Sequence, residues 1–514
     1  MRAASTDGLE VLQQPKVRSQ PAVSLVATVR TSLGRIPTAA RVCALVAFLN
    51  AVCWAQITPP FLGPDEADHY AYVQELVEEN RLPSSDFEVY SPMEVQVLTD
   101  LRYPQVRYRP SKQPISSLAE QEKLQHDLAS PLPLGGSGTA GVATAEPPLY
   151  YLLETIPYKV GASGSVLDRL ELMRLLSAIL GGLTALFAFL FLREALPANR
   201  WAWTVGGLGV AASPMLGFDT GALNPDALLL VVATALFYCL ARAFRRGLTQ
   251  RSALTIGALI AIGFLTKLNF IGLAPGVILG LILLVYREAR GHGVRAYARL
   301  LAPVLAIAAS PGLLYALVNA FSNHPTLGIV SGATTSLTGF HRSISSELSY
   351  IWQFYLPRLP WMHAYFAEIF ITRQVWFRDV VGLYGWTDTV FPAWVYDFAL
   401  IPAGLILALC ARGLAFGRVQ LRSRLGELAT YAVMSVGVLA LVGATSYLSL
   451  PVKSAEYVDP RYLLPMIALW GAVLALAVRG AGRRWGPPVG ALLVVLLLAH
   501  DIFSQLQTIA RYYG

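Results

Sequence analysis

The sequence predicts an all-α polytopic membrane protein with about eleven transmembrane helices and two large loops on the outer face of the membrane. Of its 514 residues, 55% are hydrophobic and only 14% are charged, and the mean hydropathy is +0.51. About a quarter of the residues are charged in a typical soluble domain, so this chain lacks the charge to cover a water-soluble surface. Apolar runs of membrane-spanning length and an alternation of positive charge between successive loops complete the argument.

The apolar runs define the predicted spans. A transmembrane helix needs roughly 20 mostly apolar residues. Runs that reach or nearly reach this length lie at 42–58, 173–192, 201–217, 225–241, 252–266, 268–286, 299–320, 394–411, 427–449, 462–478 and 485–503. The stretch 252–286 holds one charge, Lys267, so it predicts either two short helices or one interrupted helix.

Positive charge predicts the orientation of these spans, because Lys and Arg collect in short cytoplasmic loops. With a cytoplasmic N-terminus, seventeen arginines fall in the inner loops, and only Lys267, Lys453 and Arg461 fall in the short outer ones. We therefore predict a multi-pass protein with its N-terminus in the cytoplasm and its C-terminus outside. The formal charge of +8 then reflects membrane topology and contact with lipids, and it does not indicate a nucleic acid partner.

The chain divides into a tail and one membrane domain. Residues 1–40 are polar and basic and predict a flexible cytoplasmic tail, whereas 41–510 form a single polytopic domain. The outer loops 59–172 and 321–393 are too long to be simple connections. Their aromatic segments, such as 351–355 and 361–365, suit helices that lie in the membrane interface.

An acidic cluster opens the first outer loop. Pro64 suits the first position of a helix, and at roughly 100° per residue Asp65 and His69 share a face while Glu66 lies to the side. Carboxylates and an imidazole at the membrane boundary could act as a general base or hold a divalent cation. First-turn acids could equally complement the helix dipole.

Other polar residues stand at the outer ends of spans or in the outer loops. Glu146 and Tyr150 flank a diproline that imposes an extended backbone or a turn. Asp226 begins a span, where an acid could cap the helix or face a cavity. Lys267 could extend to lipid headgroups or meet a phosphate.

Two later segments carry further candidates. The segment 385–388 places Trp386 beside Asp388. Arg461 lies at the outer mouth of a span, where its guanidinium could bind a phosphate through two hydrogen bonds or pair with a nearby acid. The chain holds no Walker A loop, so nothing supports nucleotide hydrolysis.

Taken together and in order, five segments resemble a bacterial membrane protein family, the domain of unknown function 2142. They are the Pro-Asp-Glu-x-x-His stretch from Pro64 to His69, Pro-Pro-Leu-Tyr-Tyr at 147–151, the Asn224 and Asp226 turn, Gly-Trp-Thr-Asp at 385–388 and Arg-Tyr-Leu-Leu-Pro at 461–465. The resemblance covers roughly 40–510. That family is similar to membrane glycosyltransferases with the GT-C fold, which implies a polyprenyl-phosphate-linked sugar donor, a site on the outer face of the bacterial plasma membrane, and acids of the first outer loop in catalysis.

Our leading hypothesis from the sequence is a glycosyltransferase that moves a sugar from a polyprenyl phosphate to a glycan or lipid acceptor of the cell envelope. We expect Asp65 to act as base, with Glu66 as alternative or helper and His69 in an orienting role. Arg461 and Lys267 are the expected phosphate ligands. Contacts to the sugar or the acceptor are expected from Glu146, Tyr150, Asp226, Trp386 and Asp388. A divalent cation could serve as cofactor, although the acidic pair is Asp-Glu and not a spaced D-x-D.

Two other functions fit the same residues. A carrier or flippase for a lipid-linked glycan would show a similar groove and similar cations, but it would need polar groups spread through several spans. A non-catalytic scaffold of an envelope-synthesis complex would pack the face of Asp65 and His69 against other side chains.

Overall fold

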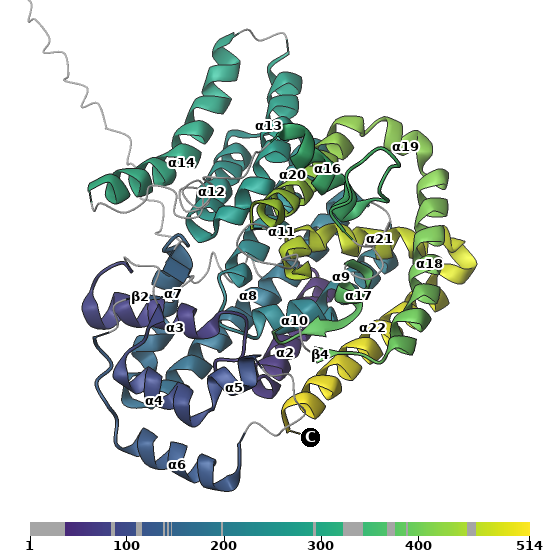
Figure 1. Ribbon diagram of the computed structural model, residues 1–514. Helices are drawn as coiled ribbons and strands as arrows, with labels where there is room; N and C mark the ends of the chain where they lie inside the picture. Colours follow the sequence, from purple (N-terminus) through teal and green to yellow (C-terminus); the bar gives the residue numbers. More distant parts are fainter. Residues whose placement is uncertain are drawn as a thin grey trace, which may run out of the picture. The chain divides into compact units, whose positions relative to one another are not determined.

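The fold is almost entirely helical, and its long helices follow the apolar runs of the sequence (Figure 1). The computed structural model describes residues 36–83, 88–108, 116–136, 139–140, 143–144, 146–196, 199–290, 294–321, 343–366, 376–386, 389–449 and 459–513. The predicted tail 1–40 lies almost entirely outside them. The chain from Ala39 onward forms one compact unit.

Long helices cover the predicted spans. They are α2 (Thr38–Ile57), α8 (Val166–Ala195), α9 (Arg200–Ala211), α10 (Pro214–Thr220), α11 (Asp226–Arg246), α12 (Gln250–Thr266), α13 (Ala274–Ala289), α14 (Val294–Phe321), α18 (Ala393–Phe416), α20 (Leu425–Ser449), α21 (Ile467–Gly480) and α22 (Gly482–Tyr513). Among the described residues, seven segments are long and apolar enough to cross a membrane. The all-α polytopic class is therefore confirmed, while the count of eleven spans stays a prediction.

Two of the runs are interrupted. The run 201–217 breaks between α9 and α10, because the Ser213 hydroxyl accepts a hydrogen bond from the backbone of Leu216 and Pro214 starts a new helix. The stretch 252–286 is two short helices, α12 and α13, separated by a 3₁₀ turn at Leu268–Gly272. Lys267 stands at this break in an extended conformation (φ −158°, ψ 136°).

The outer loops carry shorter elements. The first holds α3 (Glu66–Gln74), α4 (Pro92–Asp100), α5 (Tyr103–Tyr108), α6 (Leu118–Ala129) and α7 (Leu149–Val160), with β1 (Glu88–Val89) antiparallel to β2 (Thr139–Ala140). The second holds α16 (Ile344–Tyr355), α17 (Arg378–Gly382) and the antiparallel pair β3 (Leu383–Tyr384) and β4 (Thr389–Val390). The aromatic segment 351–355 is helical as expected, but 361–365 is not, since Pro357 and Pro360 remove backbone donors ahead of it.

The core is built by helices that approach closely, and α2 is anchored in it by Trp54. The Trp54 ring lies 5.6 Å from the Phe218 ring of α10 and 5.0 Å from the Tyr384 ring of β3. Its indole N–H donates to Oδ1 of Asp501 on α22 at 3.1 Å. One buried side chain thus ties together elements from both halves of the chain.

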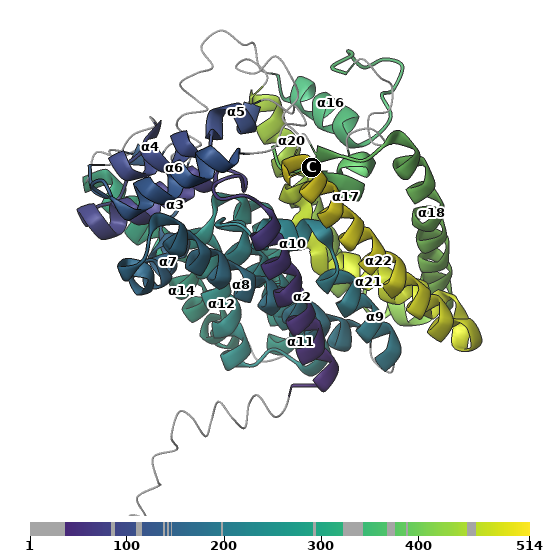
Figure 2. The same ribbon diagram turned by 90° about the horizontal axis from the view of Figure 1, so that it is seen from below.

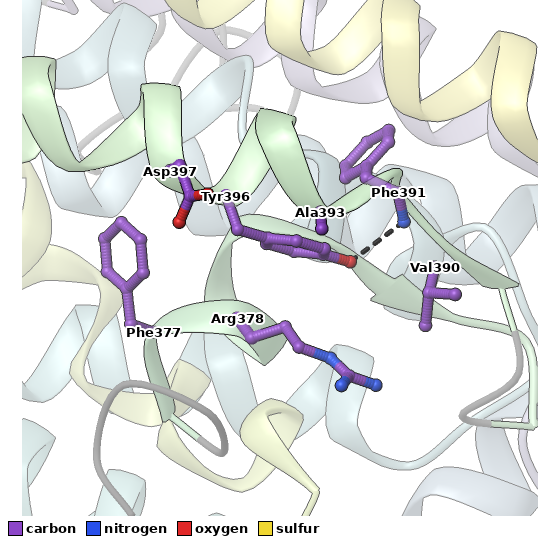
Figure 3. A pocket seen from close by; sticks show the side chains of 7 residues that line it. All are labelled: Phe377, Arg378, Val390, Phe391, Ala393, Tyr396 and Asp397. Atoms are coloured by element: carbon purple, nitrogen blue, oxygen red, sulfur yellow. Dashed lines mark hydrogen bonds between the residues drawn. The ribbon is translucent and has the colours of Figure 1, made fainter.

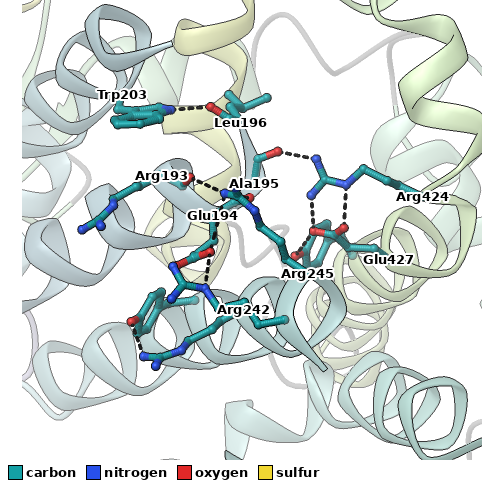
Figure 4. Close-up of polar contacts among 12 residues, drawn as sticks. Arg193, Glu194, Ala195, Leu196, Trp203, Arg242, Arg245, Arg424 and Glu427 are labelled. Carbon is teal, nitrogen blue, oxygen red and sulfur yellow. Dashed lines mark hydrogen bonds and ion pairs between the residues drawn. The ribbon is translucent and has the colours of Figure 1, made fainter. Parts of the chain in front are cut away.

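Basic loops meet at one end of the helices (Figure 4). Arg245 donates to the carbonyl oxygen of Arg193 at the C-terminus of α8, Arg246 pairs with Glu194, and Arg424 donates to the carbonyl oxygen of Ala195. Guanidinium groups from neighbouring helices therefore satisfy backbone carbonyls that the end of α8 leaves free. The assignment of this end to the cytoplasm rests on the positive-inside rule and stays a prediction.

The opposite end holds the predicted site residues and the end of α22. Figure 2 shows α2 beginning at the end away from the one where α22 finishes. Arg511, near the end of α22, donates to the carbonyl oxygen of Val106 on α5 at 3.5 Å. The outer-loop helices therefore lie over the end of the bundle that carries the site.

We predict that Gly437→Val destabilises the fold by about 1–3 kcal/mol, as overpacking does. A Cβ at Gly437 of α20 would lie 2.1 Å from the carbonyl oxygen of Gly272, beside α13. Gly404→Val in α18 is the matched control, because a Cβ there meets nothing within 4 Å. Thermal unfolding midpoints in detergent micelles check the pair, and equal midpoints for the two variants would contradict this packing.

Candidate functional site

The start of α3 positions the first site residue, Asp65. The turn before α3 contains Phe61, and both Phe61 and Asp65 have positive φ angles, of 63° and 55°. Aspartate tolerates this left-handed conformation better than most residues. The turn therefore directs Asp65 one way and Glu66 the other.

Asp65 forms an ion pair with Arg461. Its Oδ2 accepts a hydrogen bond from Nη2 of Arg461 at 3.2 Å, and 24% of the Asp65 side chain is exposed. Arg461 also lies 2.8 Å from Oδ2 of Asp459. Burial alone would raise the pKa of the Asp65 carboxyl, but the Arg461 charge and hydrogen bond, together with neighbouring positive charge that includes Arg107, hold this pKa below its usual value. Asp65 is therefore ionised at neutral pH.

Lys267 forms a second cationic centre. Its Nζ lies 2.8 Å from Oδ2 of Asp226 and 4.0 Å from Oε1 of Glu146. Burial raises the pKa of Glu146 to about 7, although Lys267 opposes the shift. The break between α12 and α13 therefore brings Lys267 to two acids that sequence analysis selected separately.

Glu66 takes part in a structural ion pair. Arg174 of α8 donates to both Glu66 oxygens, at 2.7 and 2.6 Å. The guanidinium also donates to the carbonyl oxygens of Ala55, in the last turn of α2, and of Thr58 and Pro59, which follow it. Neither side chain has more than 1% exposure. This geometry supports a structural role for Glu66, and the expected role of helper base stays a prediction.

His69 and Tyr150 both lie inside the outer-loop core. Nδ1 of His69 lies 2.9 Å from the Tyr151 hydroxyl, and burial lowers the pKa of His69 to about 3. His69 is therefore neutral at physiological pH. The Tyr150 hydroxyl lies 2.7 Å from the hydroxyl of Ser177, and the residue is fully buried. Tyr150 thus packs α7 on α8, and its expected contact with the sugar or the acceptor stays a prediction.

Trp386 lies under a guanidinium that sequence analysis did not select. The Arg107 Cζ is 3.9 Å from the centre of the Trp386 ring, and the Arg107 charge acts on the Asp65 carboxylate. The sequence gives no signal for Arg107, because a basic residue in a polar loop is not distinguished from the other basic residues of such loops. Asp388 lies outside the described residues.

Asp219 of α10 is a further acid that the sequence did not reveal. It is fully buried, and neither carboxylate oxygen has a hydrogen-bond partner among the described residues. The charges of Asp226, Arg461 and Lys267 all act on it. Asp219 ends an apolar helix, and an acid next to an apolar run is the one signal that could have drawn attention to it.

The site contains more acids than cations. Its carboxyl groups belong to Asp65, Glu146, Asp219, Asp226 and Asp459, and its cations to Lys267 and Arg461. A phosphate can bind only if it displaces carboxylates from the two cations or if some acids are protonated. No three His, Cys, Asp or Glu side chains in the described part of the chain are grouped so as to hold a metal ion.

Comparison with known families decides the classification. The family model described as predicted membrane protein (DUF2142) matches residues 48–470. This chain belongs to the DUF2142 family. The family expected from the five motifs is thereby confirmed.

The DUF2142 chain is also similar to solved membrane protein structures. ArnT from Cupriavidus metallidurans in the apo state has a TM-score of 0.44 at 13% identity, over 95% of this chain and 74% of that one. The same protein bound to undecaprenyl phosphate has a TM-score of 0.41 at 13% identity, over 94% and 77%.

The archaeal oligosaccharyltransferase AglB from Archaeoglobus fulgidus, in complex with an inhibitory peptide and a dolichol-phosphate, has a TM-score of 0.48 at 12% identity. That match covers 92% of this chain but only 56% of AglB. No curated protein matches in sequence. Similarities this distant assign neither a substrate nor a mechanism.

A cavity of about 310 Å³ lies at the N-terminal end of α18 in this DUF2142 protein (Figure 3). Its lining includes Phe377, Arg378, Phe391 and Tyr396. The Tyr396 hydroxyl accepts from the backbone of Phe391 and donates to the carbonyl oxygen of Gly382. The exposed Arg378 guanidinium thus lies among aromatic walls at the end of a candidate span.

We predict that Glu66→Gln destabilises the DUF2142 protein by roughly 3–5 kcal/mol, because it leaves the buried Arg174 guanidinium without a counter-charge. The control is Glu120→Gln on α6. Glu120 and its partner Arg102 are 33% and 39% exposed, so the expected loss is about 1 kcal/mol or less.

Thermal unfolding in detergent measures both changes. A Glu66→Gln protein with wild-type stability and no activity would instead identify Glu66 as a reacting group.

Proposed function

We propose that this protein is a glycosyltransferase that moves a sugar from a polyprenyl-phosphate carrier to an acceptor of the cell envelope, on the outer face of the bacterial plasma membrane. The observation that carries the proposal is the contact of Asp65 with Arg461, next to the pair of Lys267 and Asp226. A carboxylate able to take a proton therefore lies beside two cations able to take a phosphate.

Each group has a role in the transfer. The acceptor hydroxyl attacks the anomeric carbon while the bond from that carbon to the phosphate oxygen breaks, and Asp65 accepts the hydroxyl proton. Arg461 and Lys267 stabilise the negative charge of the departing polyprenyl phosphate. Attack from the side opposite the leaving group inverts the anomeric carbon.

Donor binding would prepare the base. In the structure Asp65 shares Arg461 with Asp459. A phosphate that binds Arg461 withdraws positive charge from Asp65, which raises the pKa of this carboxyl and makes it a stronger base. The same ion pair that keeps Asp65 weakly basic in the free protein thus couples catalysis to the presence of donor.

The remaining selected residues act around this centre. Glu146 and Asp226 hold Lys267, and the neutral His69 braces α3 through Tyr151. Trp386 offers an aromatic face for a sugar, held by Arg107. Asp388 stays a candidate on sequence grounds. The carrier chain would approach beside α18, where Trp394 and Phe398 are 64% and 59% exposed.

Neither alternative is favoured by the described residues. A flippase needs polar groups along the spans that can contact the transported glycan. Asp501 is an acid within α22, but its carboxylate accepts hydrogen bonds from Trp54 and Gln505 and serves packing between helices. A non-catalytic scaffold would bury Asp65 against other side chains. The Asp65 side chain is 24% exposed, which does not fit that role.

We predict that Asp65→Asn lowers the transfer rate at least 100-fold, since it removes the general base. Asparagine tolerates the left-handed backbone of this position, so the fold should persist. The assay follows release of labelled polyprenyl phosphate from a polyprenyl-phosphate-sugar pool by purified protein. Asp127→Asn on α6, a partly exposed acid paired with Lys123, should retain the wild-type rate, and wild-type release by Asp65→Asn would remove Asp65 from the mechanism.

We also predict that binding of polyprenyl phosphate weakens several-fold as the pH rises through about 7, the pKa of Glu146. Below this pH Glu146 is neutral and, among the described residues, Asp226 is the one acid paired with Lys267; above it the ionised Glu146 carboxylate also competes with the phosphate for this lysine. The Glu146→Gln protein should bind polyprenyl phosphate without this loss of affinity. Because the phosphate itself titrates equally in both experiments, the difference between the two pH profiles reports on Glu146 alone. Parallel pH profiles for the two proteins would contradict the role of Glu146.

A further inference from the structure

A second cavity, of about 230 Å³, lies between α4 and α5 in the first outer loop. The two helices meet at Arg102, whose left-handed backbone (φ 53°) turns the chain sharply. Side chains that line the cavity include Tyr90, Val95, Leu98, Thr99, Tyr103 and Arg107. None of the residues discussed as phosphate ligands or base takes part in it.

The lining combines aromatic rings with hydrogen-bonding groups. Tyr90 and Tyr103 offer ring faces, Thr99 offers a hydroxyl, and Arg107 is the one charged side chain in the lining. A pyranose ring presents an apolar face that packs on aromatic rings and a rim of hydroxyl oxygens that accept hydrogen bonds from a guanidinium. Ligand pockets commonly combine apolar walls with a few polar groups in this way.

Side chains that line the cavity also interact with the neighbourhood of the proposed base, Asp65. Nη1 of Arg107 donates to the Tyr103 hydroxyl at 2.9 Å, and the same guanidinium packs on Trp386 and acts on Asp65. The Tyr90 hydroxyl donates to Oδ1 of Asp68 at 2.6 Å, three residues after Asp65. A ligand in the cavity therefore contacts Arg107, whose charge acts on the acid expected to take a proton.

The cavity is placed for a water-borne ligand. Its wall helix α4 is joined to α6, a polar helix without a buried residue, by a hydrogen bond from Gln96 to Asp127, and both Figure 1 and Figure 2 show α4, α5 and α6 far from α18. Donor and acceptor can thus reach Asp65 from different sides.

We infer that this cavity binds a sugar ring of the acceptor, so that the acceptor is a glycan presented from the aqueous side. This inference rests on the proposed transferase function and specifies its acceptor. A lipid acceptor that stays in the bilayer would have no use for the cavity.

The test fills the cavity and measures binding without turnover. Thr99→Trp and Val95→Trp each place an indole in the cavity from an exposed position of α4, and Gln105→Trp on α5 adds the same bulk outside the lining. Saturation-transfer NMR with methyl glycosides of common hexoses and pentoses probes the sugar site. A fluorescent polyprenyl phosphate probes the donor site.

We expect at least one glycoside to bind wild type and Gln105→Trp, and its signal to fall at least fivefold in Thr99→Trp and Val95→Trp. Polyprenyl phosphate should bind all four proteins equally. No glycoside binding by the wild type, or binding unchanged in both filled variants, would overturn the inference. So would a loss of polyprenyl phosphate binding in the filled variants, because the cavity would then belong to the donor.

The outcomes separate this inference from the proposed function. If Asp65→Asn abolishes transfer while the filled variants still bind glycosides, only the acceptor cavity is wrong. If the filled variants lose glycoside binding while Asp65→Asn transfers at the wild-type rate, the cavity stands as a sugar site and the proposed chemistry fails.

Discussion

The site depends on one desolvated ion pair, between Arg174 and Glu66. The guanidinium donates to Glu66 and to three backbone carbonyl oxygens at the C-terminal end of α2 and just after it. Glu66 in turn accepts from the backbone N–H of Leu223, just before α11. A guanidinium taken out of water is costly unless its hydrogen bonds are complete, and here one pair fixes the end of α2, the start of α3, and α8 together. The conformation of Asp65 follows from this fixed point, since the preceding turn has no freedom to move it.

The balance of charge explains how one site could hold both a base and a phosphate. Each cation already has a carboxylate partner, so the empty site is electrically satisfied and does not attract anions strongly. A phosphate must replace carboxylates, and every carboxylate that it replaces becomes more basic. Excess acid, which would weaken a simple anion site, therefore suits a site in which leaving-group binding and proton removal are linked.

The sequence predicted the helical class, the apolar runs and the grouping of Asp65, Asp226, Lys267 and Arg461 at one end, because hydropathy and helix ends are local properties. It could not assign Glu66 and Arg174 to each other, since 108 residues separate them and neither residue shows a pattern that names a partner. The break at Ser213, before Pro214, was missed because apolar composition continues through it. Tertiary packing alone brings Asp219 and Arg107 to the site, so the sequence could not select them. The motifs shared with a family were the part of the sequence that predicted where the site lies.

The break between α12 and α13 has a consequence for the bilayer itself. At about 1.5 Å per residue, the 17 residues of α12 and the 16 of α13 fall short of a hydrocarbon layer roughly 30 Å thick. Short spans draw the lipid surface inward around them. We expect the outer leaflet to be locally thinned above Lys267. Lipid headgroups would then lie closer to the lysine, and its side chain would not need to extend to reach them.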